Sequence, residues 1–402
     1  MPHAEFVLLG DLILPDRLLP QGAIHVRDGR IAAVGAAGEV LPQVAPQVPR
    51  VDAANRLLAP GFIDLHVHGG AGADFMDGNE AAFGAVLTAH ARHGTTSLLP
   101  TSTAARHEQI LAMLRLCRQF AARADGPRAR VLGAHFYGPY FRKEARGCHP
   151  ADPVRPPEAA EYELYLEYAD AIRTASIAPE LPGAEAFTRA CVERGVRVGA
   201  GHTHATFTEM AAAVNWGVRH VDHLYCAMSD KSKLRQRQPY PMQGGVLEAT
   251  LYFDELTTEV IADGKHLSPD LLLLALKIKG PDRLALVTDC NRALDMPEGP
   301  YVFGPLEGGE PFIHHDGVGK MPDGLALASS TRGMDHMVRT FVALTGRPIW
   351  EAVRMASLTP ARIAGCDQEL GSLTPGKRAD LLTLSPELEV EQVYIGGRRL
   401  EA

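Results

Sequence analysis

Short apolar runs of strand length alternate with longer segments of helical periodicity through the middle of the chain. Eight runs are predicted to be strands: Gly61–His68, Thr95–Pro100, Arg130–Phe136, Ser176–Ala178, Val196–His202, His220–Leu224, Glu259–Asp263 and Leu284–Asp289. Helical patterns fall between most of them, as at Asn79–His93, Pro157–Thr174 and Pro269–Lys279. Strands that alternate with helices imply parallel pairing and right-handed crossovers. The pattern predicts an α/β fold, a (β/α)8 TIM-type barrel, with an active site at the carboxyl ends of its strands.

The two ends of the chain share a different pattern, in which short β-rich runs are separated by turns. Near the N-terminus, Arg27–Arg30 contains an Asp-Gly pair between two apolar runs, which predicts a hairpin. Near the C-terminus, Ala379–Leu384 and Val390–Ile395 have strand character. Neither end is long enough to bury a core alone, so we expect both to form one small β-sandwich domain. The predicted domains are 1–58 plus 371–402 for the β-sandwich and 59–370 for the barrel, with a long loop at 229–243.

Composition narrows the class of protein. The 402 residues include 40 Lys and Arg against 48 Asp and Glu, a net charge of −8, which gives no basic face for a nucleic acid. The longest apolar run, Leu271–Leu276, is too short to span a membrane, and the first residues do not resemble a signal peptide. Six cysteines without a CxxC pair argue against a disulfide framework. We expect a cytoplasmic protein with no nucleic-acid or membrane partner.

Histidines gather where the predicted strands end. Alternation along the first strand puts His66 and His68 on one face, so their imidazoles converge. The fifth, sixth and eighth strands end near His202, His223 and Asp289. Imidazole nitrogens with a carboxylate suit Zn²⁺ best, and also Fe²⁺, Mn²⁺ or Co²⁺. The sequence therefore predicts a site for a divalent metal at the mouth of the barrel.

Each of these residues has a plainer explanation when taken alone. A His-x-His pair arises by chance, a single buried His is usually a core residue, and Asp289 could cap a helix. The combined placement at separate strand ends favours the metal site. His135 and His204 fit either explanation. The remaining histidines that we expect on surfaces or in local packing are His90, His93, His107, His220, His314 and His315.

Longer runs then show a family resemblance. Gly61–Gly70 resembles the first-strand motif of the amidohydrolase superfamily. Several other runs resemble the N-acetylglucosamine-6-phosphate deacetylases within it: Ala178–Glu180, Gly201–Thr206, His223–Met228, Ile261–His266, Leu286–Asp289, Met355–Arg362 and Gly371–Asp380. The resemblance covers nearly the whole chain, and the order of the motifs is specific. It implies an amidohydrolase barrel with a bound divalent metal.

The resemblance also implies roles for individual residues. His202 and His223 match metal ligands, and His66 and His68 match the further pair used by two-metal members. Asp289 matches the catalytic carboxylate, a general base toward water and then a general acid toward the leaving amine.

The implied substrate contacts surround the same position. His266 matches a residue that helps to polarise the substrate carbonyl, and His149 matches one that touches sugar hydroxyls. Arg237-Gln238-Pro239 resembles the run whose Arg binds phosphate. The full set of expected substrate-binding residues is Tyr137, Gly138, His149, Cys226, Ala227, Arg237 and His266.

Two departures from the family pattern alter the expected site. Tyr137 stands where the family has a metal-ligating Glu, and Cys226 stands where it has a phosphate-contacting Asn. Without a bridging carboxylate, two neighbouring dications repel each other strongly. We therefore expect one metal per chain, as in adenosine deaminase. The expected ligands are His66, His68, His202 and Asp289, with His223 either ligating or hydrogen-bonding the water.

The predicted function is metal-dependent amide hydrolysis, and most specifically N-deacetylation of an amino sugar or its 6-phosphate. Two alternatives stay open at this point. One is another amidohydrolase reaction, such as hydrolysis of a cyclic amide or a deamination. The other is an impaired barrel that serves as a binding protein. The expected partners are a small-molecule substrate and a second copy of the chain in a homodimer.

Overall fold

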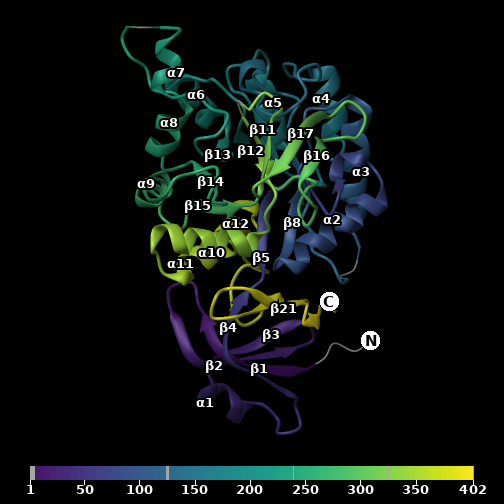
Figure 1. Cartoon of the computed structure of the whole chain (residues 1–402), viewed down its shortest axis with the longest axis vertical. Helices are drawn as coiled ribbons and strands as arrows, with labels where there is room; N and C mark the ends of the chain where they lie inside the picture. The colour runs from purple at the N-terminus through teal and green to yellow at the C-terminus, as the bar shows by residue number, and fades with distance from the viewer. Residues whose placement is uncertain (1–4, 124–125, 239, 325, 402) are drawn as a thin grey trace.

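The computed structural model describes residues 5–123, 126–238, 240–324 and 326–401, and it consists of a barrel and a smaller sheet domain that holds both chain ends (Figure 1). The eight barrel strands are β5 (Phe62–Val67), β8 (Thr95–Pro100), β10 (Ala134–Phe136), β11 (Ile172–Ile177), β12 (Arg197–Ala200), β13 (Val218–Val221), β14 (Thr257–Ile261) and β15 (Leu284–Val287). Neighbouring strands pair in parallel in the order that the sequence predicted. The (β/α)8 barrel is therefore confirmed.

The barrel closes through short contacts at the two seams between its three-stranded and six-stranded sheets. Parallel bridges join Val67 to Cys290 and Thr101 to His135, which link the three-stranded and six-stranded sheets. Thr288 donates to the buried Asp64 carboxyl from its hydroxyl (2.5 Å) and from its backbone nitrogen (3.2 Å). These bonds place the ends of β5 and β15 side by side.

Three details of the predicted elements were wrong. The strand expected at Arg130–Phe136 is split into β9 (Arg130–Val131) and β10, because Gly133 between them has a φ of 130°. The helix expected at Pro157–Thr174 ends at Leu166, and its last predicted residues start β11. The loop expected at 229–243 contains helix α7 (Lys231–Arg235), which begins where the Asp230 side chain accepts two backbone N–H groups; residue 239 lies outside the described residues.

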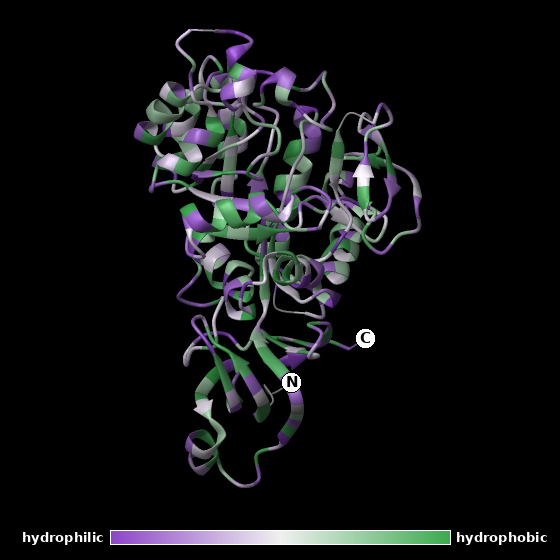
Figure 2. Cartoon of the chain, turned by 60° about the vertical axis from the view of Figure 1, so that its left-hand side comes forward, coloured by the Kyte–Doolittle hydropathy of each residue, from purple (hydrophilic) through white to green (hydrophobic). Residues whose placement is uncertain are grey.

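Helices cover the outside of the barrel, and hydrophobic stretches concentrate on the central strands and the helices packed against them (Figure 2). The longer ones are α2 (Glu80–Arg92), α3 (His107–Ala121), α4 (Ala159–Leu166), α5 (Ala184–Glu193), α6 (Phe207–Trp216), α9 (Pro269–Lys279) and α10 (Met334–Thr345). Shorter ones are α8 (Val246–Tyr252), α11 (Ile349–Met355), α12 (Leu358–Ala364) and the 3-10 turns Phe75–Asp77 and Lys143–Ala145. One large cluster of buried apolar side chains unites strands and helices into a single core.

A four-stranded antiparallel sheet that the sequence analysis did not predict follows β15. Its strands are β16 (Gly299–Phe303), β17 (Glu310–His315), β18 (Val318–Lys320) and β19 (Leu327–Ser330). A small hairpin, β6 (Gly69–Gly70) with β7 (Ala73–Asp74), follows β5. The sheet matters for function because Phe303 and Ser329 extend into the mouth of the barrel.

The chain ends form one continuous seven-stranded sheet in the order β22-β21-β20-β4-β1-β2-β3. The strands are β1 (Phe6–Ile13), β2 (Leu18–Arg27), β3 (Arg30–Ala36), β4 (Arg50–Pro60), β20 (Leu381–Leu384), β21 (Val390–Ile395) and β22 (Arg398–Arg399). The predicted hairpin is confirmed, since Asp28 and Gly29 have φ values of 53° and 73° between β2 and β3. Side chains from both ends share one core, and α1 (Ala37–Val40) with the turn Leu41–Gln43 packs on the other face. The exact domain limits at 58 and 371 stay predictions.

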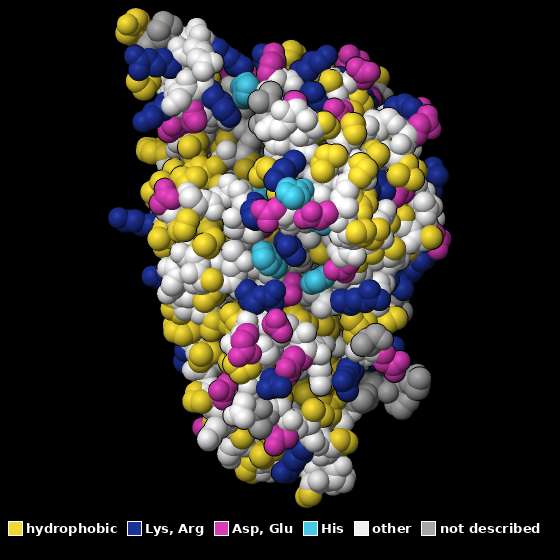
Figure 3. All heavy atoms as spheres, in the orientation of Figure 1, with side chains coloured by type: hydrophobic (Ala, Val, Ile, Leu, Met, Phe, Trp, Pro, Cys, Tyr) yellow, Lys and Arg dark blue, Asp and Glu magenta, His cyan; other side chains and the backbone are white. Residues whose placement is uncertain are grey.

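The surface gives two further observations. On the face shown in Figure 3, Lys and Arg side chains are interspersed with Asp and Glu rather than gathered into one field. Within the described ranges, no helix has the length and apolar character needed to cross a membrane.

A partly exposed ion-pair network at the end of α2 gives a prediction about stability. Burial opposes a charge on His93, but hydrogen bonds of 3.0 Å to Asp295 and to Asp335 raise its pKa to about 9. The unfolded pKa is near 6.5, so this stabilisation is fully present below pH 6.5 and is lost as the pH rises through 9. We expect His93→Gln to lower the free energy of unfolding by about 1–2 kcal/mol at pH 6 and by clearly less at pH 9.5.

Urea unfolding of both proteins at the two pH values measures this difference. His315→Gln is the matched control, because His315 pairs with Glu298 at the exposed surface and its loss should change stability little. An equal destabilisation by His93→Gln at both pH values would show that the ion pairs do not stabilise the fold.

Candidate active site

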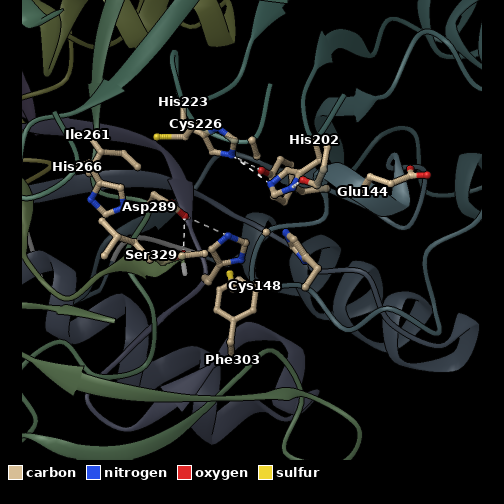
Figure 4. A pocket seen from close by; sticks show the side chains of 18 of the residues that line it. Glu144, Cys148, His202, His223, Cys226, Ile261, His266, Asp289, Phe303 and Ser329 are labelled. Atoms are coloured by element: carbon tan, nitrogen blue, oxygen red, sulfur yellow. Dashed lines mark hydrogen bonds and ion pairs between the residues drawn. The ribbon is translucent and has the colours of Figure 1, made fainter. Parts of the chain in front are cut away.

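A pocket of about 490 Å³ opens at the carboxyl ends of the barrel strands. Figure 4 shows His202, His223, Asp289 and His266 projecting into it from different sides. The predicted site residues that line it are His68, Tyr137, His149, His202, His223, Cys226, Ala227, His266 and Asp289. His66 lies directly behind this wall and is fully buried. The residues expected from separate segments of the sequence are therefore brought together.

One group in the pocket has the geometry of a metal centre. His66, His68 and Asp289 each offer a ligand atom, and these atoms lie within 4.8 Å of one another. Asp289 Oδ1 is 3.7 Å from His66 Nε2 and 3.3 Å from His68 Nε2. His66 Nδ1 lies 2.7 Å from Glu259 Oε1, which orients the ring. Since His66 Nε2 is buried and forms no hydrogen bond within the described part of the chain, the group fits a divalent cation.

A second set of side chains lies beside this group. His202 Nδ1 donates to the Ala145 carbonyl (2.7 Å), so its Nε2 faces His223 Nε2 at 3.3 Å. The Tyr137 hydroxyl is 2.5 Å from His223 Nε2. Burial raises the pKa of this phenol well above its usual range, so it remains a neutral hydrogen-bond donor. Tyr137 thus places a hydroxyl against His223 and brings no negative charge to the centre.

Asp289 has the properties of an ionised base. Burial opposes ionisation, but His66 and His68 together lower the pKa of its carboxyl below the ordinary value. The Ser329 hydroxyl donates to Oδ1 at 3.1 Å. The Asp289 backbone is left-handed, with a φ of 45°, and so is that of His202, at 46°. Such strained non-glycine conformations gather at functional sites.

Two more histidines have fixed ring orientations. His266 Nδ1 lies 2.7 Å from Asp263 Oδ2. Burial opposes its charge, but this hydrogen bond raises the pKa of His266, which favours a protonated ring with Nε2–H free to donate. His149 Nδ1 accepts the Ala104 N–H (3.2 Å), which leaves its proton on Nε2. Burial lowers the pKa of His149 well below the usual range, so this ring is neutral.

Two expected substrate contacts lie outside the pocket wall. The Arg237 guanidinium is exposed and lies 2.8 Å from His204 Nδ1, and His204 itself lines the pocket. Gly138 forms a left-handed turn, with a φ of 74°, against the backbone of Ala104. The roles of Arg237 and Gly138 in substrate binding stay predictions.

Sequence reasoning missed several residues of this site. Glu259, 1% exposed, orients His66; a charged residue inside an apolar strand was the available signal. Lys233 lines the pocket from α7, where a loop was expected. Phe303 comes from strand β16 of the antiparallel sheet, which the sequence pattern did not predict.

Comparisons with known proteins cover nearly the whole chain. The Amidohydrolase family model matches residues 57–400. The chain is 37% identical over 388 residues to N-acetylgalactosamine-6-phosphate deacetylase from Escherichia coli O157:H7, covering 96% of this chain and 97% of that protein. It is 33% identical to N-acetylglucosamine-6-phosphate deacetylase from Vibrio furnissii, over 85% of this chain and 82% of that one.

Solved structures of deacetylases are similar to this chain over nearly its whole length. N-acetyl-D-glucosamine-6-phosphate deacetylase from Mycobacterium smegmatis, solved in complex with N-acetyl-D-glucosamine-6-phosphate, has a TM-score of 0.88 and 29% identity, and covers 99% of this chain and 100% of that one. Together with the family match, these likenesses make the protein a hydrolase that acts on C–N amide bonds with a divalent metal. The chain belongs to the amidohydrolase family.

Proposed function

We propose that the protein removes the acetyl group from an N-acetylated amino sugar 6-phosphate, with one metal ion held by His66, His68 and Asp289. The observation that carries this proposal is the placement of Asp289 beside two histidines in a pocket of about 490 Å³. That volume suits a ligand of monosaccharide size. The most similar relatives described above are named as deacetylases of such phosphates.

The metal and the residues have separate tasks in this reaction. A divalent metal, when bound, lowers the pKa of water to about 7 and polarises the carbonyl as a Lewis acid. His66 presents its unpartnered Nε2 to that position, and Glu259 fixes the ring from the other side. Zinc fits the imidazole and carboxylate donors best.

Asp289 moves the proton. Its ionised carboxylate accepts a proton from water as the water oxygen forms a bond to the acetyl carbon. His266, held by Asp263, donates a hydrogen bond to the developing oxyanion. As the C–N bond breaks, Asp289 returns the proton to the departing nitrogen. The products are acetate and the free amino sugar phosphate, and Asp289 is again ionised.

Positive charge at the pocket rim supports a phosphorylated substrate. Lys233 lines the pocket from α7, and Arg237 follows one turn later beside His204. Cys226 and Ala227 line the same pocket. We further propose, from the sequence and the family, a cytoplasmic homodimer; sedimentation of the purified protein measures its oligomeric state.

A substrate panel tests the activity itself. N-acetylgalactosamine-6-phosphate, N-acetylglucosamine-6-phosphate and both unphosphorylated sugars are compared by the acetate that the zinc-loaded enzyme releases. We expect turnover of at least one phosphate ester and a much lower kcat/KM for its unphosphorylated sugar. No acetate from any of the four would contradict the proposed function.

The first prediction about the reaction separates the roles of Asp289 and Tyr137. Asp289→Asn removes the proton acceptor and should lower kcat by at least about 100-fold, the usual scale of general acid–base catalysis. Tyr137→Phe removes one hydrogen bond to His223 and should cost less. Both variants are assayed with their metal content measured, because lost metal would otherwise resemble a lost base. Near-normal turnover of metal-loaded Asp289→Asn, with none for Tyr137→Phe, would reverse the two roles.

The second prediction is that this pocket holds one metal ion. Neutral Tyr137 supplies no charge to separate two neighbouring dications, which therefore repel. Elemental analysis of the double variant His66→Asn/His68→Asn should show one equivalent less per chain than the wild type. His204→Gln is the control, because His204 lines the pocket outside the metal group. A loss of two equivalents would indicate a two-metal pocket.

The third prediction concerns the phosphate. If Arg237 contacts it, Arg237→Ala should raise KM for the phosphorylated substrate by about ten-fold or more, on the order of 1.4 kcal/mol. Arg235→Ala is the matched control, since Arg235 is an equally exposed arginine at the end of α7, two residues before Arg237. An unchanged KM for Arg237→Ala would exclude Arg237 as the phosphate contact.

A further inference from the structure

A second cluster of possible metal ligands lies inside the barrel, beneath the pocket. His220 comes from β13, Asp222 follows the same strand, and Glu259 comes from β14. Each offers one ligand atom, and the three atoms lie within 4.8 Å of one another. Asp222 and Glu259 are each 1% exposed and His220 is 9% exposed. Nothing in the proposed reaction uses His220 or Asp222.

Asp222 is the least satisfied member of the cluster. Neither of its carboxylate oxygens has a hydrogen-bond partner among the residues that the structure describes. The neighbouring Ser176 hydroxyl is bonded to His135 Nε2 (2.9 Å), which itself lies 3.9 Å from Asp222 Oδ1. Gly201 makes room for the carboxylate, because a Cβ there would lie 2.1 Å from Oδ2. While it is ionised, a buried carboxylate in such surroundings is stable only beside a counter-charge.

The hydrogen bonds of His220 show which of its nitrogens is available. The Thr257 hydroxyl donates to the Arg219 carbonyl (3.1 Å), so it accepts a hydrogen bond from His220 Nδ1 (2.8 Å). The other ring nitrogen, Nε2, then faces Glu259 Oε2 at 3.2 Å. A lone pair and a carboxylate oxygen repel each other unless a cation or a proton lies between them.

A separate cavity leads to this cluster. It has a volume of about 510 Å³ and is lined by His220, Asp222, Gly199 and Thr257, with the exposed Arg197 and Glu255 at its rim. Within the described residues it shares no lining residue with the pocket at the strand carboxyl ends. An ion can therefore enter this site from the opposite end of the barrel.

We propose that His220, Asp222 and Glu259 bind a second divalent transition-metal ion, distinct from the catalytic one. Two carboxylates balance the charge of a dication, and an imidazole nitrogen favours Zn²⁺ or Mn²⁺ over Mg²⁺ or Ca²⁺. Glu259 is common to both centres, because its Oε1 holds His66 Nδ1 and its Oε2 faces His220. The interior ion therefore fixes Glu259 and, through it, the ring of a catalytic ligand. This inference does not depend on the identity of the substrate.

Anomalous diffraction from wild-type crystals grown with 1 mM ZnCl2 tests the site without any substitution. Data collected just above and just below the zinc edge should give one peak among His220, Asp222 and Glu259, and another among His66, His68 and Asp289. The absence of the interior peak would overturn the second site while leaving the proposed function intact. The absence of only the pocket peak would contradict the catalytic centre instead.

Metal content in solution provides a second test. After zinc loading and gel filtration, the wild type should retain two equivalents and Asp222→Asn one. Thr174→Val is the matched control, since Thr174 lines the same cavity and its buried hydroxyl is outside the cluster, and it should retain two. His66→Asn/His68→Asn should also retain one. If wild type and folded Asp222→Asn retain the same zinc content, the interior site is overturned.

Discussion

A buried carboxylate, Glu259, connects the mouth of the barrel to its interior. Its Oε1 accepts a hydrogen bond from His66 Nδ1 at 2.7 Å, and its Oε2 lies 3.2 Å from His220 Nε2. Burial opposes its ionisation, but the surrounding imidazoles hold the pKa of this carboxyl well below the ordinary value. A buried anion of this kind persists only where its neighbours are held in fixed orientations. Because of that requirement, His66 keeps its Nε2 aimed at the pocket.

Closure of the barrel sets the remaining geometry. Thr288 binds Asp64 across the seam between β15 and β5, and the Asp289 N–H donates to the His66 carbonyl at 2.9 Å. These two links put a carboxylate and an imidazole from opposite ends of the barrel sequence next to each other. The left-handed backbone of Asp289 then turns its side chain toward His68. The cost of that conformation is offset by the bonds that surround it.

Local sequence signals predicted much of this architecture. The strand Thr95–Pro100 and the helix Pro269–Lys279 were predicted to the residue, because clear apolar runs end at turn-forming or capping residues. The convergence of the site histidines followed from strand alternation and barrel topology. The break at Gly133 and the short helix α7 could not be predicted, since each depends on a backbone conformation or a single cap. Glu259 was missed because a partner for a charged residue within a strand is visible only in three dimensions.

Charge is distributed differently in two layers of the barrel. The upper layer is the pocket at the strand ends, and the lower layer is the cluster of His220, Asp222 and Glu259 beneath it. In the upper layer, the neutral Tyr137 hydroxyl hydrogen-bonds His223 Nε2. His223 is therefore a weaker ligand for a cation than His66 and His68, whose ring nitrogens lie close to Asp289. In the proposed reaction, Asp289 therefore both binds the metal and transfers the proton. In the lower layer, Asp222 and Glu259 bring two carboxylates together with a single imidazole. The cation proposed for this cluster lies beneath the reaction centre, where it cannot touch substrate, and it acts on catalysis through the orientation of the His66 ring.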